Sequence, residues 1–231
     1  MTKFIAVHSG KGGVGKSTVA INVAASLLER GARVILVDLN LDTPHIGLYL
    51  GLVTPEHHIH QFLLGTKDLR NTVYKHESGL RFIPAASTPE MKHINIHEVF
   101  EHLDKAFDFV VIDCPSGFSS LVHDILKQAD ESIVVTTPTM SAVYDAQKTK
   151  ELAEKYSHTI AAVLVNNPHN LVGLELDEIK KTLEHSTLYV IPHDTKIPVS
   201  QQHGGPLVYL YPHAKSRKIF VDLASHLMHG M

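Results

Sequence analysis

The sequence predicts a doubly wound α/β fold, in which a mostly parallel sheet carries helices on both faces. Short apolar runs without polar alternation recur along the chain, separated by amphipathic helical stretches. That pattern is typical of parallel strands buried on both faces. A glycine-rich stretch follows the first run, and two further runs end on carboxylates, Asp38 and Asp113. Because ligands of such sheets bind outside the carboxyl ends of the strands, we expect a polar site there.

The first half of the chain supplies the expected strands and helices in alternation. Residues 4–7 are an apolar run short enough for a buried strand, and the apolar positions of residues 17–30 recur at helical spacing. Residues 33–38 read as the second strand and residues 39–51 as a loop containing Pro44 and Gly47. A short helix at residues 57–64, closed by Gly65, and a strand at residues 79–84 follow.

The second half repeats the same alternation to the end. We predict helices at residues 98–107, 141–156, 176–183 and 214–229, and strands at residues 109–113, 132–136, 160–165 and 188–191. No linker, internal repeat or low-complexity segment interrupts the pattern. We therefore expect residues 1–231 to form a single domain.

Composition excludes several classes of protein. The chain has 231 residues, 44% of them hydrophobic, which fits a globular rather than a disordered protein. Its formal net charge of −3 comes from 21 basic and 24 acidic residues, a balance that gives no general attraction to nucleic acid. The single cysteine, Cys114, excludes an internal disulfide framework and an all-cysteine metal cage within one chain.

We expect a cytoplasmic protein without a membrane anchor. No apolar run approaches the ~20 residues that span a bilayer. Met1-Thr2-Lys3 leads directly into the first strand, without room for a signal peptide. The apolar positions of the last helix, including Phe220 and Leu223, favour a helix packed on the core over one lying on a membrane surface.

Histidine is the unusual component, with 18 residues. They are scattered along the chain apart from His57-His58-x-His60. That cluster has the wrong density for a committed metal site, so we interpret it as surface histidine.

The stretch from Gly10 to Ser17 matches the phosphate-binding pattern Gly-x4-Gly-Lys-[Ser/Thr] at every fixed position. A strand before it and a helix after it make an anion site from main-chain N–H groups and the helix dipole, which adds about half a positive charge. Lys16 is expected to reach the β- and γ-phosphates and Ser17 to hold Mg²⁺. We expect nucleotide contacts from the whole loop: Gly10, Lys11, Gly12, Gly13, Val14, Gly15, Lys16, Ser17 and Thr18.

A second lysine, Lys11, makes this loop resemble the deviant phosphate loop of the MinD/ParA family of ATPases, Lys-Gly-Gly-x-Gly-Lys-[Ser/Thr]. The resemblance covers nearly the whole chain and looks closest to the compact, MinD-like branch. It implies a P-loop ATPase that binds ATP and Mg²⁺. In that family the early lysine reaches the nucleotide of a partner subunit, so the resemblance also implies a nucleotide-dependent homodimer.

The two switch segments of the family have counterparts here. Asp113 with Pro115 and Gly117 resembles the second switch, Asp-x-Pro-x-Gly, which implies that Asp113 holds Mg²⁺ and that the Gly117 N–H senses the γ-phosphate. Asp38 opens the first switch, near the metal. Where the family usually has a second, water-orienting aspartate, this chain has Asn40, which cannot accept a proton as a base.

The adenine side of the site has weaker signals. Asn166, at the end of a strand, matches an asparagine that reads the adenine edge. Pro192, His193 and Asp194 match a segment whose backbone flanks the base. The resemblance thus implies catalytic roles for Lys11, Lys16, Asp38 and Asn40, and a metal site formed by Ser17, Asp38 and Asp113.

The resemblance implies an ATP-dependent dimerisation switch that hydrolyses ATP slowly, because of Asn40, and positions or regulates an unidentified regulator or cargo protein. One alternative is a ParA-type DNA segregation ATPase, which the acidic net charge does not favour. Another is a metallochaperone or iron–sulfur carrier ATPase, which usually needs paired cysteines. A metabolic kinase is least favoured, because Lys11 would have no role in it.

Overall fold

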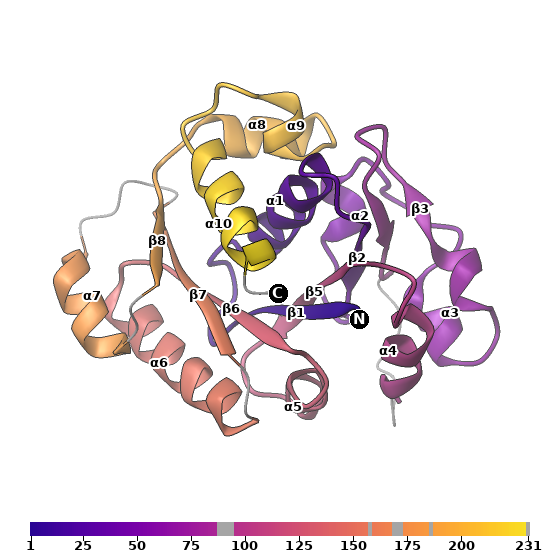
Figure 1. The fold of residues 1–231 in the computed structure, drawn as a ribbon, viewed down its shortest axis with the longest axis horizontal. Helices are drawn as coiled ribbons and strands as arrows, with labels where there is room; N and C mark the ends of the chain where they lie inside the picture. Colours follow the sequence, from indigo (N-terminus) through magenta and orange to yellow (C-terminus); the bar gives the residue numbers. More distant parts are fainter. Residues whose placement is uncertain (87–94, 157–158, 168–172, 185–186, 230–231) are drawn as a thin grey trace.

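The computed structural model describes residues 1–86, 95–156, 159–167, 173–184 and 187–229. Within them the strands form one eight-stranded sheet in the order β3-β4-β2-β5-β1-β6-β7-β8 (Figure 1). The strands are β1 (Lys3–Ser9), β2 (Val34–Asp38), β3 (Tyr74–Lys75), β4 (Arg81–Ile83), β5 (Phe109–Ser116), β6 (Glu131–Thr136), β7 (Thr159–Asn166) and β8 (Leu188–Ile191). All described pairings are parallel except the edge pair β3–β4, so the prediction of a mostly parallel sheet is confirmed.

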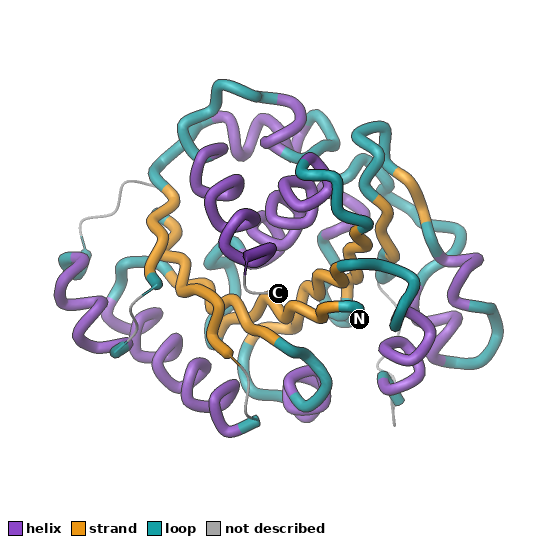
Figure 2. Tube along the Cα trace, in the orientation of Figure 1, coloured by secondary structure: helices purple, strands orange, loops and turns teal. Residues whose placement is uncertain are grey.

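Helices cover both faces of the sheet, as the doubly wound fold requires (Figures 1 and 2). One layer holds α1 (Lys16–Glu29), α2 (Ile46–Tyr49), α8 (Lys196–Gln202), α9 (Leu207–Leu210) and α10 (Arg217–His229). The other holds α3 (Ile59–Leu63), α4 (His97–Leu103), α5 (Ser120–Leu126), α6 (Met140–Lys155) and α7 (Leu176–Leu183). A 3₁₀ turn at Leu69–Thr72 precedes β3.

Burial on both faces explains why the strands lack polar alternation. Successive residues of β1 point into two different apolar clusters: Phe4 and Ala6 pack under α4 and α5, whereas Ile5 and Val7 pack under α1 and α10. The central strand is therefore apolar at every inner position. Its carboxyl end opens directly into the glycine-rich loop, so the core fixes where that loop lies.

The last helix behaves as predicted from its apolar spacing. In α10, Phe220, Leu223 and Leu227 are buried, and the helix packs against α1 (Figure 1). Its apolar face is thus covered by the chain itself. Among the described helices none combines the length and hydropathy needed to cross a membrane.

Short elements depart from the prediction. Residues 39–51 are not all loop, because Ile46–Tyr49 form α2. Asp38 accepts hydrogen bonds from the N–H groups of His45 and Ile46, where this helix begins. The helix predicted at 98–107 is α4, which ends at Leu103. Five further elements of the described chain were not predicted at all: β3, α5, α8, α9 and the 3₁₀ turn. Pro168, three residues beyond the strand predicted at residues 160–165, lies outside the described residues.

Candidate nucleotide-binding site

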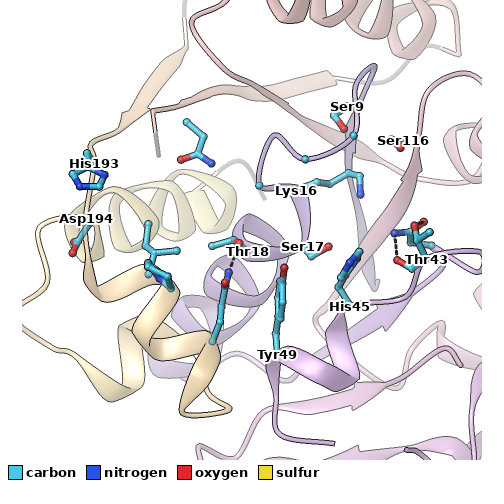
Figure 3. Close-up of a pocket in the computed structure, with 18 residues that line it drawn as sticks. Ser9, Lys16, Ser17, Thr18, Thr43, His45, Tyr49, Ser116, His193 and Asp194 are labelled. Atoms are coloured by element: carbon cyan, nitrogen blue, oxygen red, sulfur yellow. Dashed lines mark hydrogen bonds between the residues drawn. The ribbon is translucent and has the colours of Figure 1, made fainter. Parts of the chain in front are cut away.

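A pocket of about 440 Å³ opens at the carboxyl ends of the central strands (Figure 3). Its size lies within the range of small-molecule sites, roughly 300–1,000 Å³. Residues from five separate stretches of the chain line it: Ser9, Gly12, Gly13, Gly15, Lys16, Ser17, Thr18, Asn40, Thr43, His45, Tyr49, Ser116, Asn166, His193, Asp194, Ile197, Pro198 and Gln201.

The glycine-rich loop forms one wall of the pocket and leads into α1. Gly15 is the N-cap of α1 with φ of 97°, in the left-handed region that only glycine adopts readily. No side chain caps this helix and its first turn contains no acidic residue. The first N–H groups of α1 and the positive end of its dipole therefore remain available to an anion in the pocket.

Lys16 and Asp113 meet at the buried end of this wall. The Lys16 Nζ lies 3.3 Å from Asp113 Oδ1, and both side chains are almost completely buried. Within the described residues the second oxygen of Asp113, Oδ2, has no hydrogen-bond partner. Burial raises the pKa of the Asp113 carboxyl, and the Lys16 charge opposes that rise. An unpaired, buried carboxylate oxygen is the kind of ligand that a hard cation takes.

Asp38, on the neighbouring strand β2, is fully buried and has a different environment. Its Oδ1 accepts from the Asn40 N–H (3.1 Å), and its Oδ2 accepts from the His45 (3.2 Å) and Ile46 (3.1 Å) N–H groups. Burial and the nearby Asp113 raise its pKa well above the usual range of a carboxyl. Asp38 thereby fixes the loop between β2 and α2.

Asn40 lines the pocket, but its amide is occupied by the same loop. Nδ2 donates to the Thr43 carbonyl (2.6 Å) and Oδ1 accepts from the Thr43 hydroxyl (3.2 Å). Both ends of the amide therefore hold residues 40–43 together. An aspartate here would keep only one of the two contacts.

Lys11 and Gly117 lie at the rim and do not line the pocket. Lys11 is exposed, and its Nζ donates to the Ser141 hydroxyl on α6 at 3.3 Å. The Gly117 N–H donates to the Ser9 carbonyl at 2.9 Å, which joins the end of β5 to the glycine-rich loop. Gly10 and Val14 also lie outside the lining, and Gly10 packs against α6 around Asp145.

The opposite end of the pocket contains the residues expected near the base. Asn166 lines it, and its Nδ2 donates to the Val14 carbonyl at 2.8 Å. His193 and Asp194 line it as well, whereas Pro192 does not. Burial alone would raise the pKa of the Asp194 carboxyl. Hydrogen bonds from the Ser216 and Lys196 N–H groups outweigh that effect, so the pKa is lowered.

Several lining residues were not predicted from the sequence. Gln201 belongs to α8, and its Nε2 donates to the Thr18 hydroxyl at 2.8 Å. His45 and Tyr49 come from α2 and its N-cap. Both helices belong to segments without a helix prediction. For His45 and Tyr49 the available signal was proximity in sequence to the first switch.

The histidine cluster is not simply a surface feature. His60 is only 2% exposed, so the prediction of surface histidines is wrong for this residue, which faces the core beneath α3. The Lys67 Nζ donates to His57 Nε2 at 3.2 Å. No group of three or more potential metal ligands occurs among the residues that the structure describes.

Comparison with known proteins gives a consistent match. The family model described as "ParA: NUBPL iron-transfer P-loop NTPase" matches residues 1–228. The septum site-determining protein MinD of Synechocystis sp. is 33% identical over 227 residues, covering 90% of this chain and 82% of that protein.

Two solved structures are similar over nearly their whole lengths. The cell division ATPase MinD of Pyrococcus furiosus has a TM-score of 0.92 at 29% identity, with 100% of both chains covered. The septum site-determining protein MinD of Pyrococcus horikoshii OT3, complexed with Mg-ADP, has a TM-score of 0.91 at 28% identity, covering 98% of this chain and 96% of that one.

Proposed function

The chain belongs to the MinD/ParA family of P-loop ATPases, and on that premise we propose that it is an ATP-dependent dimerisation switch. ATP and Mg²⁺ bind in the 440 Å³ pocket, two subunits close over the nucleotide, and slow hydrolysis reopens them. Residues 1–231 act as one ATPase domain in the cytoplasm, and the dimer acts on an unidentified regulator or cargo protein. The Mg-ADP bound to the Pyrococcus horikoshii MinD supports the choice of ligand.

One observation carries the nucleotide assignment: the uncapped N-terminus of α1 and Lys16 line the pocket, and Lys16 pairs with the buried Asp113, whose second oxygen has no hydrogen-bond partner among the described residues. A phosphate chain carries the negative charge that Lys16 and the α1 N–H groups can bind. A magnesium ion suits the Oδ2 of Asp113 and the Ser17 hydroxyl, both hard oxygen ligands. Asp38 lies beside Asp113 on the neighbouring strand, and its oxygens hold the loop.

A Mg²⁺ ion held there would supply charge neutralisation on the phosphates, and the chain's own residues position the nucleotide and stabilise the transition state. Lys16 places a positive charge where negative charge develops, and moves from Asp113 towards the phosphates to do so. Asn40 holds its loop through Thr43 and has no basic group to accept a proton from water. Slow turnover follows from that substitution.

Dimerisation is assigned to Lys11. Its side chain is exposed at the rim and reaches Ser141 rather than the pocket of its own subunit. A lysine in that place has no contact to make with its own nucleotide. It is free to exchange its 3.3 Å contact to the Ser141 hydroxyl for a phosphate of a facing subunit, a stronger, charge-assisted partner.

Iron transfer, named in the description of the matching family model, is the second candidate. A transferred metal needs accessible thiolates, and this chain has only Cys114. That side chain is fully buried in β5, and burial raises the pKa of its thiol. The dimerisation switch is therefore preferred.

The nucleotide assignment is tested by calorimetric titration with ATP and ADP in the presence of Mg²⁺. Lys16→Ala should abolish binding of both, because it removes the buried charge matched to the phosphates. Lys127→Ala is the matched control, since that lysine is exposed on α5 and pairs with Asp124 away from the pocket. Equal affinities in the wild type and Lys16→Ala would refute the assignment.

A further inference from the structure

His45 occupies the pocket wall without a role in the assignments above. It is the N-cap residue of α2, and its main-chain N–H donates to Asp38 Oδ2 at 3.2 Å. Its ring packs on Tyr49, one turn further along, with the ring centroids 5.6 Å apart. The main chain and the ring are thus fixed from two sides, and the imidazole borders the pocket.

The imidazole lies at the phosphate end. In Figure 3 His45 stands on the side of Lys16 and Thr43, whereas His193 and Asp194 stand at the opposite end. The glycine-rich loop and the first turn of α1 determine where the phosphates lie, and His45 faces that region across the pocket.

The ring has unused hydrogen-bonding capacity. Within the described part of the chain, neither ring nitrogen of His45 makes a hydrogen bond, although its main-chain N–H does. The neighbouring Asn40 amide is taken up at both ends by Thr43. Of these two polar side chains of the first switch that border the pocket, His45 is the one with a donor to offer an anion.

We propose that the His45 side chain donates a hydrogen bond to the terminal phosphate of ATP, so that the pocket binds a nucleoside triphosphate more tightly than a diphosphate. The inference rests on the proposed function. It assigns the recognition of the terminal phosphate to α2, whose N-cap is held by Asp38. Occupation of the terminal phosphate site is thereby transmitted to α2 through its N-cap residue.

The test compares equilibrium dissociation constants for Mg-ADP and for a Mg complex of a non-hydrolysable ATP analogue. His45→Phe preserves a ring against Tyr49 but removes both nitrogens, so it should weaken analogue binding by about tenfold and leave ADP binding unchanged. His45→Gln retains an amide donor and should recover part of the loss. His203→Phe is the matched control, because His203 stacks on Tyr211 outside this pocket.

Each outcome decides the inference. A ratio of analogue to ADP affinity that falls in His45→Phe and recovers in His45→Gln supports it. An unchanged ratio, or an equal loss for both nucleotides, overturns it, because the ring would then only pack against Tyr49. If His45→Phe does not fold, His45→Ala takes its place, and the same fall in the ratio of analogue affinity to ADP affinity is expected. Failure of the wild type to bind either nucleotide would overturn the proposed function itself.

Discussion

The buried carboxylates Asp38 and Asp113 should respond differently to the same change, replacement by asparagine. Both side chains are fully buried, so the cost of burying a charge is common to them. They differ in hydrogen bonding. Asp38 accepts from three main-chain N–H groups, two of them through Oδ2, and an amide must turn its NH₂ towards at least one of those donors.

Asp113 tolerates the amide, because its Oδ1 alone accepts from Lys16 and its Oδ2 has no partner among the described residues. Asp113→Asn keeps the first contact and removes a buried negative charge whose burial outweighs its attraction to Lys16. We expect it to raise the free energy of unfolding of the nucleotide-free protein by about 0.5–2 kcal/mol. The free energy of unfolding of Asp38→Asn should be about 1–3 kcal/mol lower than that of Asp113→Asn, because one buried N–H donor is left without an acceptor.

The pH dependence has a definite sign. Burial raises the pKa of Asp113 in the folded protein, with Lys16 opposing, so the folded state holds a proton at a pH where the unfolded state has lost it. That contribution to stability is present below the ordinary carboxyl pKa and is lost as the pH rises through the folded value. The advantage of Asp113→Asn over the wild type should therefore be larger at pH 7.5 than at pH 4.

The assay is thermal unfolding of the wild type and both variants in EDTA, without nucleotide, at the two pH values. For a domain of this size, 1 kcal/mol corresponds to a shift in Tm of about 2–4 °C. Asp38→Asn should unfold roughly 2–12 °C below Asp113→Asn at pH 7.5. An Asp38→Asn variant as stable as Asp113→Asn would refute the assigned hydrogen-bond pattern.

Three further outcomes follow from the site. Gly15→Ala should lower the free energy of unfolding, measured by urea titration, by about 1–3 kcal/mol, because φ is 97° and a Cβ would overlap the Asn166 amide. Gly31→Ala is the control, since Gly31 shares the positive φ but has open space around it. An equal loss in Gly31→Ala would contradict a contribution from the overlap with Asn166. Asn40→Asp should lose the 2.6 Å bond to Thr43 yet raise single-turnover ATP hydrolysis about tenfold, and equal rates would contradict the slow-turnover proposal. Mg-ADP at ~100 times its Kd should stabilise the wild type by about 2.7 kcal/mol, and removing Mg²⁺ with EDTA should reduce this increase in Tm.

The sheet was predictable because each inner strand contacts apolar side chains on both faces. Residues 4–7 and 109–113 are apolar at every position before the carboxylate, and they lie within β1 and β5. The edge strand β3 has only two residues, both partly or fully exposed, and so leaves no apolar run to detect.

The short helices α2 and α8 were not predicted, because hydrogen bonds to Asp38 and Asp194 hold the segments in which they begin. α2 follows hydrogen bonds from the His45 and Ile46 N–H groups to Asp38, which is seven and eight residues earlier. The segment that begins α8 is held by Asp194, which also accepts from Ser216 of the chain beyond. The spacing of apolar residues, from which the other helices were predicted, reveals neither set of contacts.

The site divides in the same way. Lys16, Ser17 and the glycines follow from one contiguous motif, and all but Gly10 of those residues line the pocket. His45 and Gln201 reach it from α2 and α8, whose presence the sequence did not indicate. A motif reports residues that are contiguous in sequence, whereas this pocket is completed by residues that only the tertiary fold brings together.

The central claim, that ATP closes two subunits through Lys11, is tested most directly by light scattering with Mg-ATP and with Mg-ADP. The wild type should double its mass with ATP and remain a monomer with ADP. Lys11→Ala should bind ATP with wild-type affinity and remain a monomer, because the residue lies outside the pocket of its own subunit. A Lys11→Ala dimer of normal affinity, or a wild type whose mass is the same with both nucleotides, would contradict the account.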